Sequence, residues 1–280
     1  TNSSNKSNSN TSTTNKNNTT AKAPSSSTNT AKSTSGSTSN NVNTNTNESS
    51  EKVTIYRSNG SVVTLDLEEY VIGVVAAEMP ASFNKEALKA QSILARTYAI
   101  KSKKNNKKLT DTVSTQVYID KSQMKSKWGS EYEKYYNKIK DAVNATKGMY
   151  VTYNNQLIDA VYHSTSNGKT EDAIYVWGYS VPYLKSVDSS WDKEASSYLR
   201  TVTKDSVDIL KIFGIDTLDE LKITKRNSSG RVVEVMVGDE VYSGVDIRTM
   251  LSLRSTDFDI EIEGDTIKIT TRGYGHGVGM

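Results

Sequence analysis

Glu78 is the residue whose surroundings best suit acid–base chemistry. It ends an apolar run, Val74-Val75-Ala76-Ala77, and lies two residues before Pro80. The run has helical character, so the carboxylate is expected at the negative, C-terminal end of a helix. That position and the apolar neighbours both raise the pKa of a carboxyl group. A carboxyl group that stays protonated near neutral pH can act as a general acid; a solvated glutamate in a last helical turn is the simpler alternative.

The two histidines, His163 and His276, each lie among small residues. Their contexts are His163-Ser-Thr-Ser-Asn-Gly168 and Arg272-Gly-Tyr-Gly-His276-Gly-Val-Gly-Met280. Glycine lets a backbone approach a ligand closely, so one shared cleft and two separate structural roles are both open. A zinc hydrolase needs more ligands than two histidines, and no Gly-x-Ser-x-Gly elbow supports a serine triad.

Local patterns place Glu78 between a hairpin and a second helix. Strands are predicted at 53–56 and 62–65 around a turn at Ser58-Asn-Gly-Ser61. Asp66, with Glu69 as capping-box partner, is expected to begin a helix that ends at Glu78 because Pro80 prevents its continuation. A second helix is expected from Asn84 to about Lys103, with Gln91 and Tyr98 on one otherwise small apolar face.

The remaining elements mix helices and hairpins. We expect a helix over 130–146 with Gly148 as its stop, hairpins over 149–164 and 259–271, helices near 205–213 and 244–253, and a strand at 232–237. Helices and strands are interspersed without strict alternation, which predicts an α+β fold with antiparallel hairpins around a substrate groove.

Residues 1–50 differ in composition from the rest. They are almost entirely Ser, Thr, Asn, Lys, Ala and Gly, with Val42 as the one large apolar residue, which predicts a disordered tether. Their four lysines and one glutamate account for the net charge of +3 of the whole chain. The near-neutral remainder, 51–280, argues against nucleic-acid binding. We expect the tether to link the domain to an upstream membrane anchor.

Five blocks of the sequence resemble the signature of the SpoIID/LytB family. They contain Ala77-Glu78-Met79-Pro80, Ala90-Gln91-Ser92 with Arg96-Thr-Tyr98, Thr115-Gln116-Val-Tyr118, His163-Ser-Thr-Ser166 with Gly168, and the C-terminal Gly-rich run. The blocks occur in the family order across residues 53–280. The family pattern continues beyond Met280 with Ser-Gln-Tyr-Gly and a further helix, so we expect 51–280 to be a catalytic domain truncated at its C-terminal end, in which two lobes can meet near residue 150.

The resemblance implies a lytic transglycosylase that cleaves the bond between N-acetylmuramic acid and N-acetylglucosamine and leaves 1,6-anhydromuramoyl ends. Glu78 matches the family's catalytic acid. Ordinary glycosidases use two carboxyl groups; here the muramoyl C6 hydroxyl would be the nucleophile, and Glu171 is the candidate if a second carboxylate is needed.

By matching position, the resemblance also implies a set of groove residues that contact glycan or support those that do. They are Gln91, Arg96, Tyr98, Gln116, Tyr118, His163, Ser164, Ser166, Tyr274 and His276. Some relatives hold zinc through cysteines near the His-Ser block. This sequence has no cysteine, so we expect no metal and no cofactor.

The same family includes amidase enhancers, so the alternative function is a non-catalytic glycan-binding protein that stimulates a cell-wall amidase. Implied partners are peptidoglycan glycan strands, which can be peptide-free, a wall amidase and a membrane protein. The implied location is extracytoplasmic, at the cell wall and membrane, and the implied process is the engulfment stage of sporulation. A surface scaffold without catalysis is a third possibility.

Overall fold

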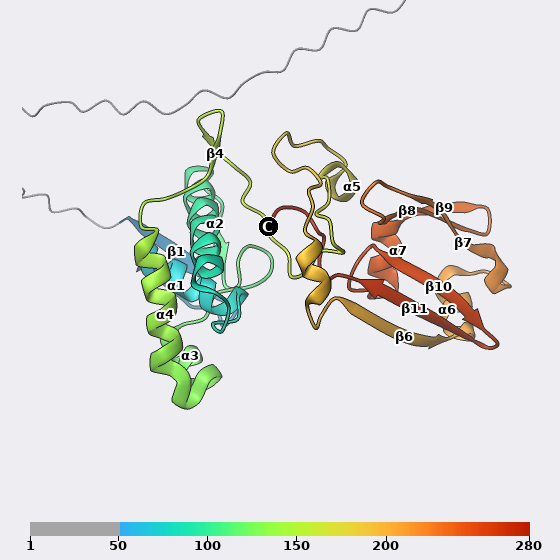
Figure 1. Cartoon of the computed structure of the whole chain (residues 1–280), viewed down its shortest axis with the longest axis horizontal. Coiled ribbons are helices and arrows are strands. Elements are labelled where there is room, and N and C mark those ends of the chain that lie inside the picture. Colours follow the sequence, from blue (N-terminus) through green and yellow to red (C-terminus); the bar gives the residue numbers. More distant parts are fainter. Residues whose placement is uncertain (1–50) are drawn as a thin grey trace, which may run out of the picture. The chain divides into compact units, whose positions relative to one another are not determined.

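The computed structural model describes residues 51–280. The predicted tether at 1–50 lies outside the described residues. Helices and small antiparallel sheets are interspersed along the chain, so the α+β prediction is confirmed (Figure 1). The lobe boundary expected near residue 150 stays a prediction.

A small sheet begins the described chain. Its strands are β1 (Lys52–Tyr56), β2 (Val62–Asp66) and β3 (Leu109–Thr110), in the order β2-β1-β3. The predicted hairpin is confirmed, because β1 and β2 pair antiparallel across a turn in which Gly60 has a φ of +85°. Glycine adopts that angle without steric cost, which is why the turn lies there.

Four helices follow this hairpin and share one hydrophobic core with it. They are α1 (Leu67–Glu78), α2 (Lys85–Lys104), α3 (Lys121–Trp128) and α4 (Tyr132–Ala145), with a 3₁₀ turn at Gly129–Glu131. Every residue of α1 from Tyr70 to Ala76 is buried, and α1 packs against both α2 and α4. Burial on all sides fixes α1 in the core, and Glu78 follows at its end with a half-buried side chain.

Both predicted helix starts are confirmed, since Asp66 and Asn84 are the N-cap residues of α1 and α2, but only one of them caps its helix with its side chain. Asn84 is confirmed as the N-cap of α2, since its side chain accepts a hydrogen bond from the Glu86 amide. The capping box predicted at Asp66 is wrong, because the Asp66 side chain makes no capping hydrogen bond and instead lies 3.7 Å from Lys52 Nζ.

The structure corrects two further predictions in the middle of the chain. Helix α3 was not predicted, because Met124 is its only buried residue and leaves no apolar stripe to recognise. The predicted 149–164 hairpin is much shorter, with β4 (Thr152–Tyr153) and β5 (Gln156–Leu157). The residues after β5 instead contact the C-terminal run, where the His163 amide donates to the Met280 carbonyl at 2.8 Å.

The C-terminal half contains two three-stranded sheets, β10-β11-β6 and β7-β8-β9. Its elements are α5 (Ile174–Trp177), β6 (Leu199–Asp205), α6 (Ser206–Phe213), β7 (Leu221–Arg226), β8 (Val232–Val237), β9 (Glu240–Ser243), α7 (Gly244–Met250), β10 (Phe258–Glu263) and β11 (Thr266–Arg272), with 3₁₀ turns at Ser190–Glu194 and Leu218–Glu220. The predicted helices, the strand at 232–237 and the final hairpin are confirmed, although α7 ends at Met250, earlier than expected. These sheets and α6 and α7 share a second core, and a small third cluster joins Ala173 to Val278.

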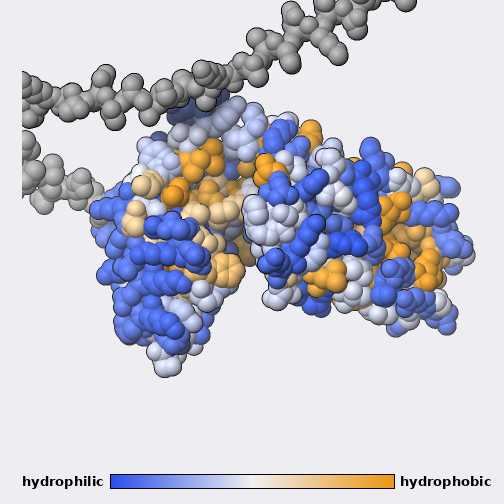
Figure 2. All heavy atoms as spheres, viewed as in Figure 1, coloured by the Kyte–Doolittle hydropathy of each residue, from blue (hydrophilic) through white to orange (hydrophobic). Residues whose placement is uncertain are grey.

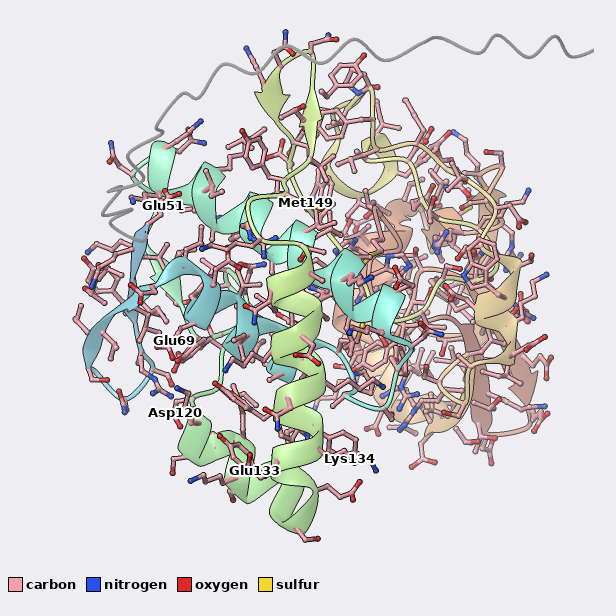
Figure 3. The ribbon with its side chains drawn as sticks, turned by 60° about the vertical axis from the view of Figure 1, so that its left-hand side comes forward. Glu51, Glu69, Asp120, Glu133, Lys134 and Met149 are labelled. Carbon is pink, nitrogen blue, oxygen red and sulfur yellow. The ribbon has the colours of Figure 1, made fainter. Side chains whose placement is uncertain are left out.

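The outward face of α3 and α4 is polar. Figure 2 shows an almost wholly hydrophilic face over α3 and α4, and Figure 3 shows Glu133 and Lys134 projecting from the start of α4. Among residues 51–280, no helix combines the length and the apolar character that crossing a bilayer requires.

Candidate functional site

Glu78 is the last residue of α1, and two hydrogen-bond donors reach its carboxylate. Met79 turns to an extended conformation and Pro80 follows, so the chain leaves the helix directly after the carboxylate. The Val117 amide donates to Glu78 Oε1 at 2.7 Å. The Tyr162 hydroxyl is the second donor. The carboxyl group is thus fixed from two segments distant in sequence.

The pKa of Glu78 is raised above its ordinary value, as predicted. Burial is the main cause, because it disfavours the charged form. The hydrogen bonds from Val117 and Tyr162 act in the opposite direction, because they stabilise the carboxylate. A protonated acid is therefore favoured, while donors are in place for the anion that would form once the proton is given away.

A buried chain of hydrogen bonds orients the Tyr162 hydroxyl. Tyr70 Oη donates to Gln116 Oε1 at 3.2 Å, and Gln116 Nε2 donates to Tyr162 Oη at 3.3 Å. Because Tyr162 Oη accepts from Gln116, its own proton points to Glu78. Burial raises the pKa of both tyrosines, so both stay protonated donors. Gln116 was predicted as a site residue; Tyr70 and Tyr162 were not.

A pocket of about 500 Å³ opens beside Glu78. Its lining comes from the chain after α1, the end of α3, α4 and Ser164; the residues are Ala77, Glu78, Met79, Pro80, Ala81, Ser82, Lys127, Trp128, Tyr135 and Ser164. Trp128 and Tyr135 meet edge-on, with ring centroids 5.8 Å apart. An aromatic wall next to polar groups suits a sugar ring.

Within residues 51–280, Lys127 is the one basic residue in the lining of this pocket. Its Nζ donates to the Ala76 carbonyl at 2.9 Å, at the end of α1, and burial lowers its pKa. Lys127, Trp128 and Tyr135 were missed by sequence reasoning because they lie on α3 and α4, which carry no recognisable motif. The capping box formed by Asp120 and Gln123 is the sequence signal that could have predicted α3.

His163 and His276 lie next to each other, as the alternative of one shared cleft requires. Their ring centroids are 6.0 Å apart. Burial lowers the pKa of His163, and burial together with the neighbouring His163 lowers the pKa of His276 to about 4. His276 Nδ1 accepts from the Val278 amide at 3.0 Å. Gly275 has a φ of +109° and packs against His163, so its missing side chain permits this approach. Both rings are neutral at physiological pH.

Arg96 lies within the scaffold and not on the pocket lining. It is fully buried, and its guanidinium forms a fork with the Glu68 carboxylate at 2.9 and 2.6 Å. It also donates to the carbonyls of Val143 and Met149, the latter just beyond α4 in Figure 3. These bonds join α1, α2 and the end of α4. The contacts support the buttressing half of the prediction for Arg96.

Other predicted site residues have neighbours that hold the scaffold. Tyr118 stacks on Tyr70 with centroids 5.8 Å apart, and Tyr98 Oη accepts from Lys107. Gln91 on α2 is 2% exposed, and its Nε2 has no hydrogen-bond partner within the described part of the chain. An unpaired buried amide is costly, so Gln91 keeps its candidacy as a group awaiting a ligand or water.

The remaining predicted residues divide between surface and interior. Ser164 is exposed in the Glu78 pocket, whereas Ser166 is fully buried and accepts from the Gly168 amide. Tyr274 is exposed, with the Arg254 guanidinium 5.0 Å from its ring centroid. Tyr274 pairs with Thr165, which fixes the C-terminal run beside the His-Ser block.

Glu171, the candidate for a second carboxylate, does not line the Glu78 pocket. It is 2% exposed, and its Oε2 accepts from Asn227 at 2.7 Å and from Ser229 at 2.9 Å. Arg231 lies 3.8 Å away. These contacts hold the carboxylate in the interior of the C-terminal half.

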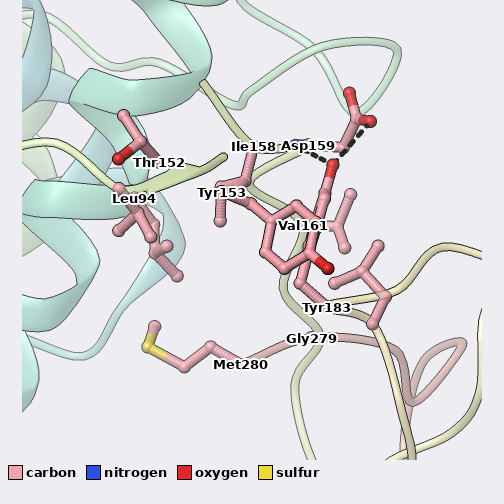
Figure 4. A pocket seen from close by; sticks show the side chains of 11 residues that line it. Leu94, Thr152, Tyr153, Ile158, Asp159, Val161, Tyr183, Gly279 and Met280 are labelled. Carbon is pink, nitrogen blue, oxygen red and sulfur yellow. Dashed lines mark hydrogen bonds between the residues drawn. The ribbon is translucent and has the colours of Figure 1, made fainter. Parts of the chain in front are cut away.

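A second pocket of about 240 Å³ lies between α2, the β4–β5 hairpin and the C-terminal run (Figure 4). Its lining is mainly apolar, including Leu94, Val161 and Met280. Its one carboxylate, Asp159, is occupied by Tyr183 at 3.1 Å and Lys101 at 2.6 Å. This pocket offers no free acid or base.

Metal ligands are not gathered in the described residues. Between residues 51 and 280, no three side chains of His, Cys, Asp or Glu come together in a way that could hold a metal ion. The expectation that the protein uses no metal stays a prediction.

Comparison with known proteins shows which sequences this chain resembles. Residues 55–153 match the family described as SpoIID, Stage II sporulation protein. The chain is 44% identical over 245 residues to Stage II sporulation protein D of Bacillus subtilis (strain 168), covering 83% of this chain and 71% of the relative. It is also 44% identical over 247 residues to Stage II sporulation protein D of Bacillus amyloliquefaciens, with the same coverage. An Amidase enhancer of Bacillus subtilis (strain 168) is 30% identical over 265 residues, covering 74% of this chain and 36% of the relative.

Proposed function

The chain belongs to the SpoIID family, and we propose that it is a lytic transglycosylase of peptidoglycan glycan strands, with Glu78 as its single acid and base. The observation that carries this proposal is the position of Glu78: raised pKa, two donors, and a pocket with an aromatic wall. Among the residues that the structure describes, no second carboxylate lines that pocket.

In the first step, Glu78 acts as the general acid. Its proton passes to the oxygen that leaves the anomeric carbon of N-acetylmuramic acid, and the glycosidic bond breaks. Burial keeps the proton on Glu78 until substrate arrives. As negative charge develops on the carboxylate, the Val117 amide and Tyr162 hydroxyl are already placed to stabilise it.

In the second step, the same carboxylate acts as the base. It takes the proton of the muramoyl C6 hydroxyl while that oxygen bonds to the anomeric carbon. The product is a 1,6-anhydro ring, Glu78 is protonated again, and no water is consumed. A pair of carboxyl groups is needed when water or the enzyme supplies the nucleophile. Here the substrate supplies it, which is consistent with one carboxylate.

The biological setting follows from the relatives. Proteins named for stage II of sporulation support a role in sporulation, with peptidoglycan strands outside the cytoplasm as the substrate. A membrane anchor upstream, a wall amidase and a membrane protein as partners, and a peptide-free substrate belong to the same proposal.

The test compares the parent protein with Glu78→Gln on purified glycan strands stripped of peptide. Mass spectrometry of the parent digest should show anhydromuramoyl-ended fragments, and the variant should show none. Glutamine keeps the size of the side chain and can still accept the hydrogen bond from the Val117 amide, so we expect the variant to fold. An unchanged melting temperature is the control for folding. Anhydro products at the parental rate from the variant would remove Glu78 from the mechanism.

The second candidate function is stimulation of a cell-wall amidase without cleavage, which the 30% identity to an Amidase enhancer supports. It predicts that Glu78→Gln still stimulates an amidase on intact wall. If the variant loses both the stimulation of the amidase and the cleavage of glycan, the transglycosylase function is favoured over this second candidate.

A further inference from the structure

A row of aromatic rings extends from the Glu78 pocket along the segment 162–179. His163 and His276 have centroids 6.0 Å apart, and His276 and Trp177 have centroids 5.5 Å apart. Trp177 in turn stacks on Tyr179, with centroids 6.4 Å apart and planes inclined by 25°. Each step falls within the range in which aromatic rings contact one another. The row is therefore continuous.

The row begins beside the candidate acid. Tyr162, which hydrogen-bonds to Glu78, directly precedes His163, and Ser164 lines the Glu78 pocket. The side chain of His276 also hydrogen-bonds to the backbone of Tyr162. One segment thus contacts the acid with one residue and begins the aromatic row with the next.

At the far end of the row, Tyr179 is open to solvent and Trp177 packs against a hydrophobic cluster. Tyr179 is 59% exposed. Trp177 is partly buried against the small cluster that includes Val181 and Val278, so α5 is attached to the C-terminal run, as the adjacent ribbons in Figure 1 also indicate. Gly178 ends α5 with a φ of +78°, which turns Tyr179 out of the helical path.

The row is also uncharged. Both histidines have lowered pKa values, and their neighbours in the row are Trp and Tyr. The His276 ring is tilted by 55° from Trp177, whereas Trp177 and Tyr179 are inclined by only 25°. The Trp177–Tyr179 end is therefore the part of the row whose neutral, partly apolar face matches the C–H face of a pyranose ring better than it matches a phosphate or a carboxylate. A polysaccharide that occupies the Glu78 pocket can continue along such a surface.

We propose that Trp177 and Tyr179 form a distal glycan-binding subsite, in which Tyr179, supported by Trp177, stacks on a sugar ring of the same strand that presents its scissile bond to Glu78. This inference rests on the proposed function, because it assigns the strand its direction out of the Glu78 pocket. Its consequence is a dependence on chain length: strands long enough to reach Tyr179 bind more tightly than short ones.

The test uses Tyr179→Ala, with Tyr179→Phe as the conservative variant and Tyr175→Ala as the matched control. Tyr175 lies on α5 beside Trp177 and is 44% exposed. Among the described residues, its ring contacts none of the rings of the row. Dissociation constants for peptide-free glycan fragments from disaccharide to octasaccharide are measured by calorimetry, in a Glu78→Gln background so that nothing is cleaved.

The expected result is that Tyr179→Ala weakens binding of the longest fragments about three- to tenfold and leaves the disaccharide unchanged. Tyr179→Phe and Tyr175→Ala should bind every length as the parent does. Equal affinities of Tyr179→Ala and parent at all lengths, or an equal loss in Tyr175→Ala, would overturn the subsite. Binding is measured without turnover, so the two proposals can fail separately. If the binding depends on length in this way but the parent protein with Glu78 intact never cleaves the strands, the subsite stands and the transglycosylase proposal is refuted.

Discussion

Replacing Arg96 by methionine distinguishes a scaffold role from a substrate contact. Arg96 is fully buried, and it forms a fork with Glu68 and reaches two carbonyls across α4. Methionine fills a similar volume without the charge. It therefore leaves Glu68 without its partner, and removing one partner of a buried pair costs about 3–5 kcal/mol. Because 23% of the Glu68 side chain is exposed and can recruit water, we expect the lower end, about 3 kcal/mol.

Urea denaturation followed by circular dichroism measures this loss, and the melting temperature should fall by roughly 6–12 °C. The matched control is Lys89→Met on the same helix, whose pair with Glu86 is at the surface and should contribute about 0.5 kcal/mol or less. Cleavage per folded molecule should stay within about twofold of the parent. An Arg96→Met protein as stable as the parent but inactive would refute the reasoning and make Arg96 a substrate contact.

Three further predictions follow from the same geometry. Tyr162→Phe removes a donor that lowers the pKa of Glu78, so that pKa should rise and the alkaline decline of cleavage should move to higher pH; a move to lower pH would contradict the hydrogen bond. Gly73→Ala should lose about 1–3 kcal/mol in chemical denaturation, because a Cβ there would overlap the Tyr118 ring, and unchanged stability would contradict the packing. His276, with a pKa of about 4, should show no NMR titration between pH 5 and 8, and a midpoint near 6.5 would show that its ring is solvated.

Local signals were sufficient for the elements that carry Glu78. The Asn59–Gly60 turn, the Asn84 cap and Pro80 each act within a few residues, so the hairpin, α2 and the end of α1 could be predicted. The apolar run before Glu78 also predicted the direction of its pKa shift, and burial is the main cause of that shift.

Long-range partners could not be predicted in the same way. Gln116 lies 46 residues from both Tyr70 and Tyr162, so nothing in the local sequence shows that the three make one hydrogen-bonded chain. Glu68 and Arg96 are 28 residues apart, and only the packing of α1 on α2 shows that they pair.

Weak patterns account for the other misses. Helix α3 has one buried residue and no stripe, so its wall of the pocket was missed together with Lys127 and Trp128. The Asp66 capping box failed for the opposite reason: the pattern is present, but the side chain takes no part in capping and lies near Lys52 instead.

The central claim is that Glu78 catalyses cleavage without water. The most direct test is to digest peptide-free glycan strands in ¹⁸O-labelled water and to measure the masses of the products by mass spectrometry. The account predicts anhydromuramoyl ends that carry no ¹⁸O, formed by the parent protein and absent with Glu78→Gln. Reducing ends labelled with ¹⁸O would show hydrolysis, and would contradict a mechanism in which the muramoyl C6 hydroxyl is the nucleophile.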